Sequence, residues 1–225
     1  MNRDYHDTDD HECHDNDNYK TNVRRNTMSS MKRLLLSLTV MLLALTKTHA
    51  GENKPEVSLD AKVPNFTLKD YTGKEHSLYR YLNNRGVVVM FISTECPVSN
   101  SYNERMVELY KTYLRRGIGF LAINSNSGES IDEIARHSKN HGFEFPVLKD
   151  WNNVIADKFD ALVTPETYLI DSAGVLRYHG RIDDSPRMAK VKEHDLQDVL
   201  DAYLAGKPLP KREARALGCT IKRVD

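Results

Sequence analysis

The stretch from Gly86 to Ile92 is a nearly continuous apolar run that is rich in β-branched residues. Such a run predicts a central β-strand that is buried on both faces. A polar segment, Ser93–Ser99, follows it, and residues 100–115 then carry apolar side chains at helical spacing. The chain therefore predicts a strand–loop–helix unit with Cys96 at the carboxyl end of a buried strand.

The remainder of the chain alternates strands and helices around this unit. Ser130 and Glu133 form a capping box that opens one of the helices. The expected strands are residues 63–68, 117–124, 145–148, 166–171 and 175–180, and the expected helices are residues 100–115, 131–141, 153–159 and 191–204, with a helical turn at 78–84. Because the last two strands read as a hairpin, this order predicts an α/β fold with a mixed sheet.

The region before the fold has the organisation of a secretory signal. Lys32 and Arg33 precede a twelve-residue, mostly apolar run, Leu34–Leu45, and small residues lead to a cleavage site after Ala50. The run is too short for a membrane-spanning helix. We expect residues 28–50 to be a signal peptide, and a buried core helix is the alternative.

The segments on either side of this signal differ in character. Residues 1–27 are rich in Asp, Asn and His without periodicity, and we interpret them as a disordered leader or an over-long gene prediction. A metal site at His11, Cys13 and His14 is an alternative that lacks a paired ligand motif. Residues 51–225 then form one domain with a carboxyl-terminal tail. We expect it to be exported, periplasmic or secreted, with no membrane span after cleavage.

Composition argues against several classes of function. The chain has 225 residues, with 32 Lys plus Arg against 32 Asp plus Glu, whereas a nucleic-acid-binding protein usually shows a basic excess. It has no P-loop, dinucleotide fingerprint, haem motif or paired-cysteine zinc motif, so we expect no cofactor and no metal. His137 and His141 lack a third ligand nearby. We interpret them as surface histidines whose cationic form is favoured at a helix C-terminus.

Cys96 is the strongest candidate for chemistry. A cysteine just before a helix lies in the positive field of the helix N-terminus, which favours the thiolate. The thiolate is the species that attacks disulfides and peroxides. Glu95 opposes this effect by like-charge repulsion, and a purely apolar role for Cys96 is the alternative. Residues 51–225 contain one other cysteine, Cys219, which allows one disulfide in an exported protein.

The residues around Cys96 resemble the thioredoxin superfamily. Phe91 lies five residues before Cys96, as a strand Phe does before the first active-site cysteine, and Ser99 stands where the second cysteine of C-x-x-C would be. Thr164-Pro165 resembles the Thr-Pro whose proline is cis and faces the active-site sulfur; a trans proline at a strand edge is the alternative. The resemblance implies a thioredoxin-like three-layer α/β/α sandwich with a central mixed β-sheet.

Within that superfamily the chain is most similar to the peroxiredoxin-like (AhpC/TSA, redoxin) branch of exported redoxin-domain proteins. Cys96-Pro97, the stretch Tyr178–Asp184 and the ending Gly218–Lys222 carry this resemblance, which covers roughly residues 58–222. Their order and spacing carry more weight than any one of these short motifs.

The chain departs from the peroxiredoxin pattern near the cysteine. Peroxiredoxins place Pro seven residues and Thr three residues before the peroxidatic cysteine, and this chain has Val89 and Ser93 there. Arg181 is the candidate activating arginine. With Asp183 and Asp184 it is expected to line a partner or substrate groove, and a solvated strand end is the equal alternative.

The resemblance implies a thiol–disulfide oxidoreductase outside the cytoplasm. In it Cys96 attacks and Cys219 is the candidate resolving cysteine. Thr164 and Pro165 belong to the catalytic group, with Pro165 positioning the substrate backbone. The supporting residues are Ser93, Thr94, Pro97, Ser99 and Arg181. The implied partners are protein or small-molecule thiols and disulfides, peroxide as a further substrate, and an external thiol reductant. Two alternatives stay open: a peroxiredoxin-like thiol peroxidase, and a non-catalytic module whose Cys96–Cys219 bond is structural.

Overall fold

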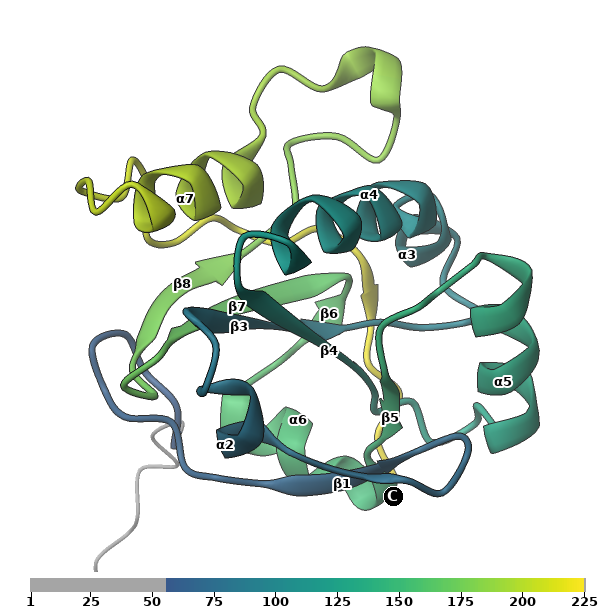
Figure 1. Ribbon diagram of the computed structural model, residues 1–225. Helices are drawn as coiled ribbons and strands as arrows, with labels where there is room; N and C mark the ends of the chain where they lie inside the picture. Colours follow the sequence, from purple (N-terminus) through teal and green to yellow (C-terminus); the bar gives the residue numbers. More distant parts are fainter. Residues whose placement is uncertain (1–55, 225) are drawn as a thin grey trace, which may run out of the picture. The chain divides into compact units, whose positions relative to one another are not determined.

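The computed structural model describes residues 56–224, which contain a seven-stranded mixed sheet in the order β2-β1-β5-β4-β3-β7-β8 (Figure 1). The expected leader, the signal peptide and the residues His11, Cys13 and His14 lie outside the described residues. The strands are β1 Thr67–Asp70, β2 Glu75–Ser77, β3 Gly86–Phe91, β4 Ile118–Asn124, β5 Val147–Lys149, β7 Glu166–Asp171 and β8 Leu176–Gly180. β3 runs parallel to β4 and antiparallel to β7, so the sheet is mixed as predicted.

The apolar run of β3 divides its side chains between two cores because successive residues of a strand point to opposite faces. Val88 and Met90 belong to the core on one face, and Val87, Val89 and Phe91 belong to the core on the other. All are fully buried, and each buried side chain of this size contributes about 1.5–3 kcal/mol of stabilisation. This two-sided burial explains why the run is continuous rather than alternating.

Helices cover both faces of the sheet, giving the predicted three layers. α4 (Asn103–Leu114), α5 (Ile131–Asn140) and α7 (Asp195–Leu204) supply residues to one core, and α2 (Leu78–Tyr81) and α6 (Val154–Phe159) supply residues to the other. In Figure 1 α4 and α7 lie above the sheet and α2 and α6 lie below it. The capping box that opens α5 is present as predicted.

Two predicted helices have different bounds. The helix expected at 100–115 is divided into α3 (Pro97–Asn100) and α4, with Ser101 and Tyr102 between them. The helix expected from residue 191 begins at Asp195 instead. There the Asp184 carboxylate accepts the backbone N–H groups of residues 192 and 193, and this holds both residues outside the helix. A short 3-10 turn, η2, occupies Met188–Lys190.

The first predicted strand is also displaced. Residues 63–66 lie outside β1, where Val63 donates its N–H to the Gly174 carbonyl. β1 instead extends to Asp70 and forms a hairpin with β2, which the sequence pattern did not predict. A second 3-10 turn, η1 (Trp151–Asn153), precedes α6.

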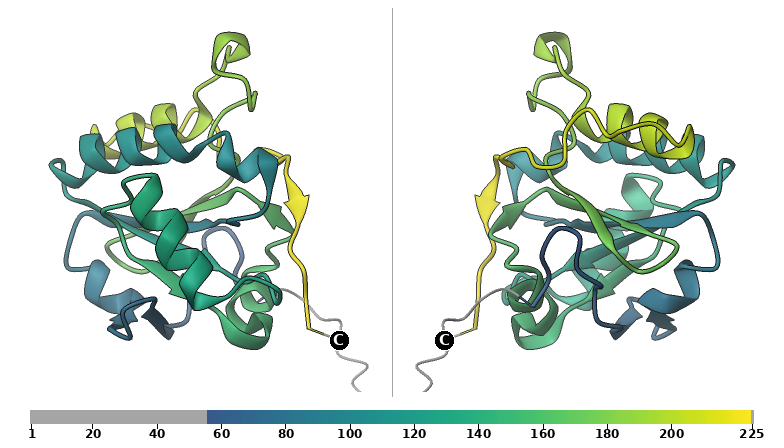
Figure 2. Two further views of the ribbon diagram at one scale, coloured as in Figure 1. Left: turned by 90° about the vertical axis from the view of Figure 1, so that its right-hand side faces the viewer. Right: turned by 90° about the vertical axis from the view of Figure 1, so that its left-hand side faces the viewer.

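The carboxyl-terminal tail returns to the carboxyl end of β3. Its strand β9 (Cys219–Thr220) pairs antiparallel with β6 (Val163–Thr164), and the two form a small separate sheet. Figure 2 shows β9 in yellow beside the main sheet. No helix within residues 56–224 has the length and apolar character needed to cross a bilayer.

Candidate active site

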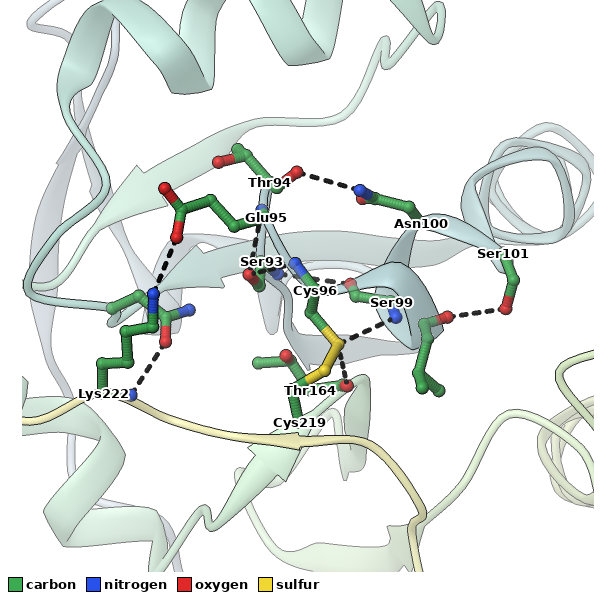
Figure 3. The surroundings of a disulfide bond; sticks show 12 residues. Ser93, Thr94, Glu95, Cys96, Ser99, Asn100, Ser101, Thr164, Cys219 and Lys222 are labelled. Atoms are coloured by element: carbon green, nitrogen blue, oxygen red, sulfur yellow. Dashed lines mark hydrogen bonds and ion pairs between the residues drawn. A yellow bond between two sulfur atoms is a disulfide. The ribbon is translucent and has the colours of Figure 1, made fainter.

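Cys96 and Cys219 form a disulfide with their Cα atoms 5.8 Å apart, although 123 positions separate them in the chain (Figure 3). Cys96 directly follows the polar loop after β3, and Cys219 begins β9. The tail therefore brings the only two cysteines of residues 56–224 together. Cys96 is 4% exposed and lies beneath the tail, whereas Cys219 is partly exposed.

Two backbone groups contact the Cys96 sulfur. As the N-cap of α3, its Sγ accepts the Ser99 N–H at 3.3 Å, and it lies 3.3 Å from the Thr164 carbonyl oxygen. The N–H favours a thiolate, and the carbonyl favours a protonated thiol that donates to it. α3 is only four residues long. The group that stabilises negative charge on the Cys96 sulfur is therefore the Ser99 N–H and not the field of a long helix.

The peptide bond between Thr164 and Pro165 is cis, as the resemblance implied. Thr164 also pairs with Cys219 across the small sheet, so the residue before the cis proline contacts both halves of the disulfide. Pro165 itself is buried. The structure thus brings together four predicted site residues: Cys96, Cys219, Thr164 and Pro165.

Gly218 allows this close approach of the tail. A Cβ at this position would lie 2.0 Å from the Thr164 carbonyl oxygen and 2.6 Å from its carbonyl carbon. Both are backbone atoms, which cannot move aside as a flexible side chain can. Gly218 is therefore required for the tail to lie against β6 with Cys219 in bonding position.

The loop before Cys96 is held by Ser93 and Ser99. The Ser93 hydroxyl accepts the Cys96 N–H at 2.9 Å and the Glu95 N–H at 3.2 Å. The Ser99 hydroxyl in turn accepts the Ser93 N–H at 3.2 Å, so the residue in the place of a second active-site cysteine is structural. Pro97 occupies the first position of α3, where a missing N–H costs nothing.

Glu129 supports this loop from below and was not identified from the sequence. Its carboxylate accepts hydrogen bonds from the Ser93 hydroxyl, from the Thr94 N–H (2.6 Å) and hydroxyl (2.7 Å), and from the Asn124 amide (2.5 Å). Glu129 is 1% exposed. Burial acts to raise the pKa of its carboxyl, but the hydrogen bonds from Ser93, Thr94 and Asn124 outweigh burial and hold that pKa below its ordinary value.

A buried lysine lies behind Glu129. The Lys149 ammonium donates to the backbone carbonyls of Glu129 (2.8 Å) and Asn126 (2.6 Å) and to the Asn124 side chain (3.2 Å). Burial lowers the pKa of Lys149, while the charge of Glu129 opposes that change. The loop that carries Cys96 thus rests on an internal polar network whose members are hydrogen-bonded to one another.

Glu95 is compensated by the tail. Its carboxylate forms an exposed ion pair with the Lys222 ammonium at 2.7 Å, which Figure 3 shows beside the disulfide. The expected repulsion between Glu95 and a Cys96 thiolate is therefore reduced while the tail is in place.

Arg181 is engaged with acidic residues and is not hydrogen-bonded to Cys96. Its guanidinium donates to Asp195 (2.6 Å) and Glu193 (2.7 Å) at the start of α7, and none of the hydrogen bonds within residues 56–224 joins it to Cys96. Asp183 is buried in an ion pair with Arg105. The alternative prediction, that this residue lies at a solvated strand end, is therefore wrong for Asp183. These side chains, with Asp184, hold the loop between β8 and α7 in place.

The two helical histidines are packed together, with ring centroids 4.4 Å apart. Burial, assisted by the charge of His141, lowers the pKa of His137 to about 4. The predicted preference for a cationic form is therefore wrong for His137, because packing against Asn103 and Phe143 outweighs the helix terminus. Residues 56–224 contain no cluster of three or more His, Cys, Asp or Glu side chains suited to a metal.

The residues that the sequence did not reveal are Glu129 and Asn124. Glu129 stands next to the capping box of α5, and Asn124 ends β4, so both fall at element boundaries where polar residues are ordinary. A buried carboxylate has no sequence signature of its own. Only the packing of β3 beside β4 shows that both side chains meet the active-site loop.

The chain is similar to several known proteins. The thiol-disulfide oxidoreductase ResA of Geobacillus thermodenitrificans is 28% identical over 156 residues, covering 67% of this chain and 88% of that protein. ResA of Bacillus subtilis is 31% identical over 121 residues, covering 54% of this chain and 66% of that protein.

Solved structures show the same similarity. A hypothetical protein from Sinorhizobium meliloti has a TM-score of 0.69 and 30% identity, over 75% of this chain and 96% of that one. An uncharacterized conserved protein from Geobacillus kaustophilus has a TM-score of 0.70 and 30% identity, over 74% of this chain and 93% of that one.

Residues 59–179 match the AhpC/TSA family over more than half of the chain. The matched segment contains Cys96 and the cis Thr164–Pro165 bond, within an α/β sandwich of the thioredoxin type. The chain belongs to the AhpC/TSA family and is a thioredoxin-like oxidoreductase.

Proposed function

We propose that the protein is a thiol–disulfide oxidoreductase that uses Cys96 as its nucleophile and Cys219 as its resolving cysteine. The observation that carries this proposal is the Cys96–Cys219 disulfide itself, which lies against the cis Thr164–Pro165 bond with the Cys96 sulfur accepting the Ser99 N–H. The similarity to ResA proteins, which are named as thiol-disulfide oxidoreductases, supports the same activity.

The proposed reaction begins from the reduced pair. The Cys96 thiolate attacks a substrate disulfide, forms a mixed disulfide and releases one substrate thiolate. The Cys219 thiolate then attacks the Cys96 sulfur and releases the second substrate thiolate. The substrate gains two electrons and the pair loses two, which leaves the disulfide present in the structure. An external thiol reductant restores the dithiol.

The surroundings of Cys96 support disulfide exchange over peroxide reduction. The hydroxyl of Ser93, which stands where peroxiredoxins have Thr, donates to Glu129 and accepts the Cys96 N–H. The candidate activating arginine, Arg181, is engaged with Asp195 and Glu193. A thiol peroxidase needs a donor and a cation beside the reacting sulfur, and these two candidates are occupied elsewhere.

We also propose that the domain acts outside the cytoplasm, in the periplasm or as a secreted protein. The order of charged, apolar and small residues in 28–50 supports export. The presence of a disulfide is in keeping with an oxidising compartment. Expression of the full chain with detection of the mature amino terminus by mass spectrometry would test cleavage after Ala50.

The decisive test of the activity is a redox titration of the Cys96–Cys219 pair in native protein. Samples are equilibrated across a glutathione series and alkylated, and the masses of their peptides are measured by mass spectrometry. We expect the bond to form and break at a moderate potential without unfolding. A bond that resists reduction below about −300 mV until the protein unfolds would identify it as a structural crosslink and refute the catalytic proposal.

A further inference from the structure

In the oxidised protein the two cysteines of the disulfide differ in their exposure to solvent. Cys96 is 4% exposed, and its sulfur lies between the Ser99 N–H and the Thr164 carbonyl, each at 3.3 Å. Cys219 is partly exposed, and it lies on the tail, which forms the outer of the two strands. Figure 3 shows Cys96 enclosed by the loop and by Thr164, with the tail running past it.

Thiol–disulfide exchange requires the attacking thiolate to approach along the sulfur–sulfur axis, on the side opposite the leaving sulfur. At Cys96 the approach is restricted, because the Ser99 N–H and the Thr164 carbonyl already lie against the sulfur and the residue is buried. An attack on Cys219 comes from the side away from Cys96. Because the rate of exchange depends on access to the sulfur that is attacked, the two sulfurs are not equivalent.

The leaving group favours the same direction. When Cys96 leaves, its thiolate keeps the hydrogen bond from the Ser99 N–H, while the Thr164 carbonyl opposes the charge until the thiol is protonated and donates to it. Within residues 56–224 no hydrogen bond is donated to the Cys219 sulfur, so a leaving Cys219 thiolate lacks this stabilisation. A stabilised thiolate leaves faster.

The tail also holds Cys219 in place through the step. On one side Ala214 donates its N–H to the His179 carbonyl at 3.1 Å, and on the other Ile221 donates its N–H to the Leu162 carbonyl at 3.0 Å. Ile221 is 3% exposed and packs in the core. Cys219 therefore stays close to Cys96 when the bond between them breaks.

We infer that the external reductant attacks Cys219, and that Cys96 is the leaving thiolate. This inference rests on the proposed function. Cys96 forms the mixed disulfide with the substrate, whereas Cys219 forms the mixed disulfide with the reductant. A reductant thiolate forms a bond to the Cys219 sulfur, the Cys96–Cys219 bond breaks, and the electron pair goes to Cys96. A second thiol of the reductant then attacks the reductant sulfur of this mixed disulfide. The reductant departs as a disulfide, and the Cys219 thiolate is released. Two thiols are oxidised and one protein disulfide is reduced.

Sulfite tests this assignment because it marks the sulfur that it attacks. It converts a disulfide into one S-sulfonate and one thiol, and the two are told apart by peptide mass. The full chain in its oxidised form is treated with sulfite for a series of times, quenched in acid and digested. At the shortest times we expect at least about tenfold more S-sulfonate on Cys219 than on Cys96. Urea-unfolded protein is the control, in which the two sulfurs share the label evenly.

Label that falls mainly on Cys96, or evenly on both sulfurs of native protein, would overturn the inference. A native bond that does not react with sulfite under conditions that cleave the unfolded protein would overturn it as well, since an accessible Cys219 must react. The redox titration distinguishes these failures from failure of the proposed function. Label on Cys96 combined with a moderate potential refutes only the order of attack, whereas a bond that is reduced only on unfolding refutes the activity.

Discussion

Replacing the buried carboxylate of Glu129 by an amide is the most informative perturbation of the active-site support. In Glu129→Gln the size of the side chain is kept, but four charge-assisted hydrogen bonds, from Ser93, Thr94 and Asn124, become bonds to a neutral group. One of the two acceptor oxygens also becomes an NH₂ group. If this NH₂ group faces Ser93, the bond between them is lost, because the Ser93 hydroxyl already accepts the Cys96 and Glu95 N–H groups, and the other three bonds remain.

The magnitude follows from the difference between charged and neutral hydrogen bonds. A bond to a charged group contributes about 1.5–3 kcal/mol and a neutral one about 1 kcal/mol, so three weakened bonds and one lost bond together remove several kcal/mol. Removing the buried charge relieves its desolvation cost and offsets part of that loss. We expect the free energy of unfolding to fall by about 2 kcal/mol at pH 7.

The effect has a defined pH dependence. Because the pKa of Glu129 is lower in the folded protein than its ordinary value of 4.5, its stabilisation is fully present above that value and is lost as the pH falls through the folded pKa. The difference in stability between wild type and Glu129→Gln is therefore expected to shrink below about pH 4.5. Urea denaturation of both oxidised proteins at pH 7 and pH 3.5 measures this difference.

The matched control is Glu144→Gln, an exposed carboxylate whose ion pair with Lys111 has a distance of 3.6 Å. Its stability should stay within about 0.5 kcal/mol of wild type. Equal stability of Glu129→Gln and wild type at pH 7 would refute the argument that this carboxylate holds the loop. So would a difference that does not change with pH.

Three further outcomes are expected. Gly218→Ala places a methyl group against the Thr164 backbone and should cost about 1–3 kcal/mol by urea denaturation, whereas Gly128→Ala, with open space around it, should cost less. His137, with a pKa of about 4, should titrate well below an ordinary histidine by NMR, and protein stability should fall between about pH 6.5 and pH 4 because the unfolded chain binds the proton first. Cys219→Ser opens a loop of 123 positions and should lower the unfolding free energy of oxidised protein by about 5 kcal/mol on the loop-entropy estimate; a loss below about 1 kcal/mol would contradict it.

The sequence determined the elements whose signals are local. The continuous apolar run of β3, the capping box of α5 and the hairpin of β7 and β8 were all predicted, because each depends on periodicity or turn chemistry within a few residues. Motif resemblance added the cis proline and the thioredoxin-like layers. The predicted ends of helices were less accurate where a side chain from another segment binds the backbone, as the Asp184 carboxylate does just before α7.

Only the tertiary structure decided which chemical groups meet. Local sequence marked Cys96 and Cys219 as candidates, but their bond depends on the tail pairing with β6 and on the absence of a Cβ at Gly218. The structure places Arg181 against Asp195 and Glu193, and it brings Glu129, which the sequence did not reveal, to the loop that carries Cys96. The physical reason is that burial and hydrogen bonding arise between segments far apart in the chain, so the environment of a side chain is fixed by packing and not by its neighbours in sequence.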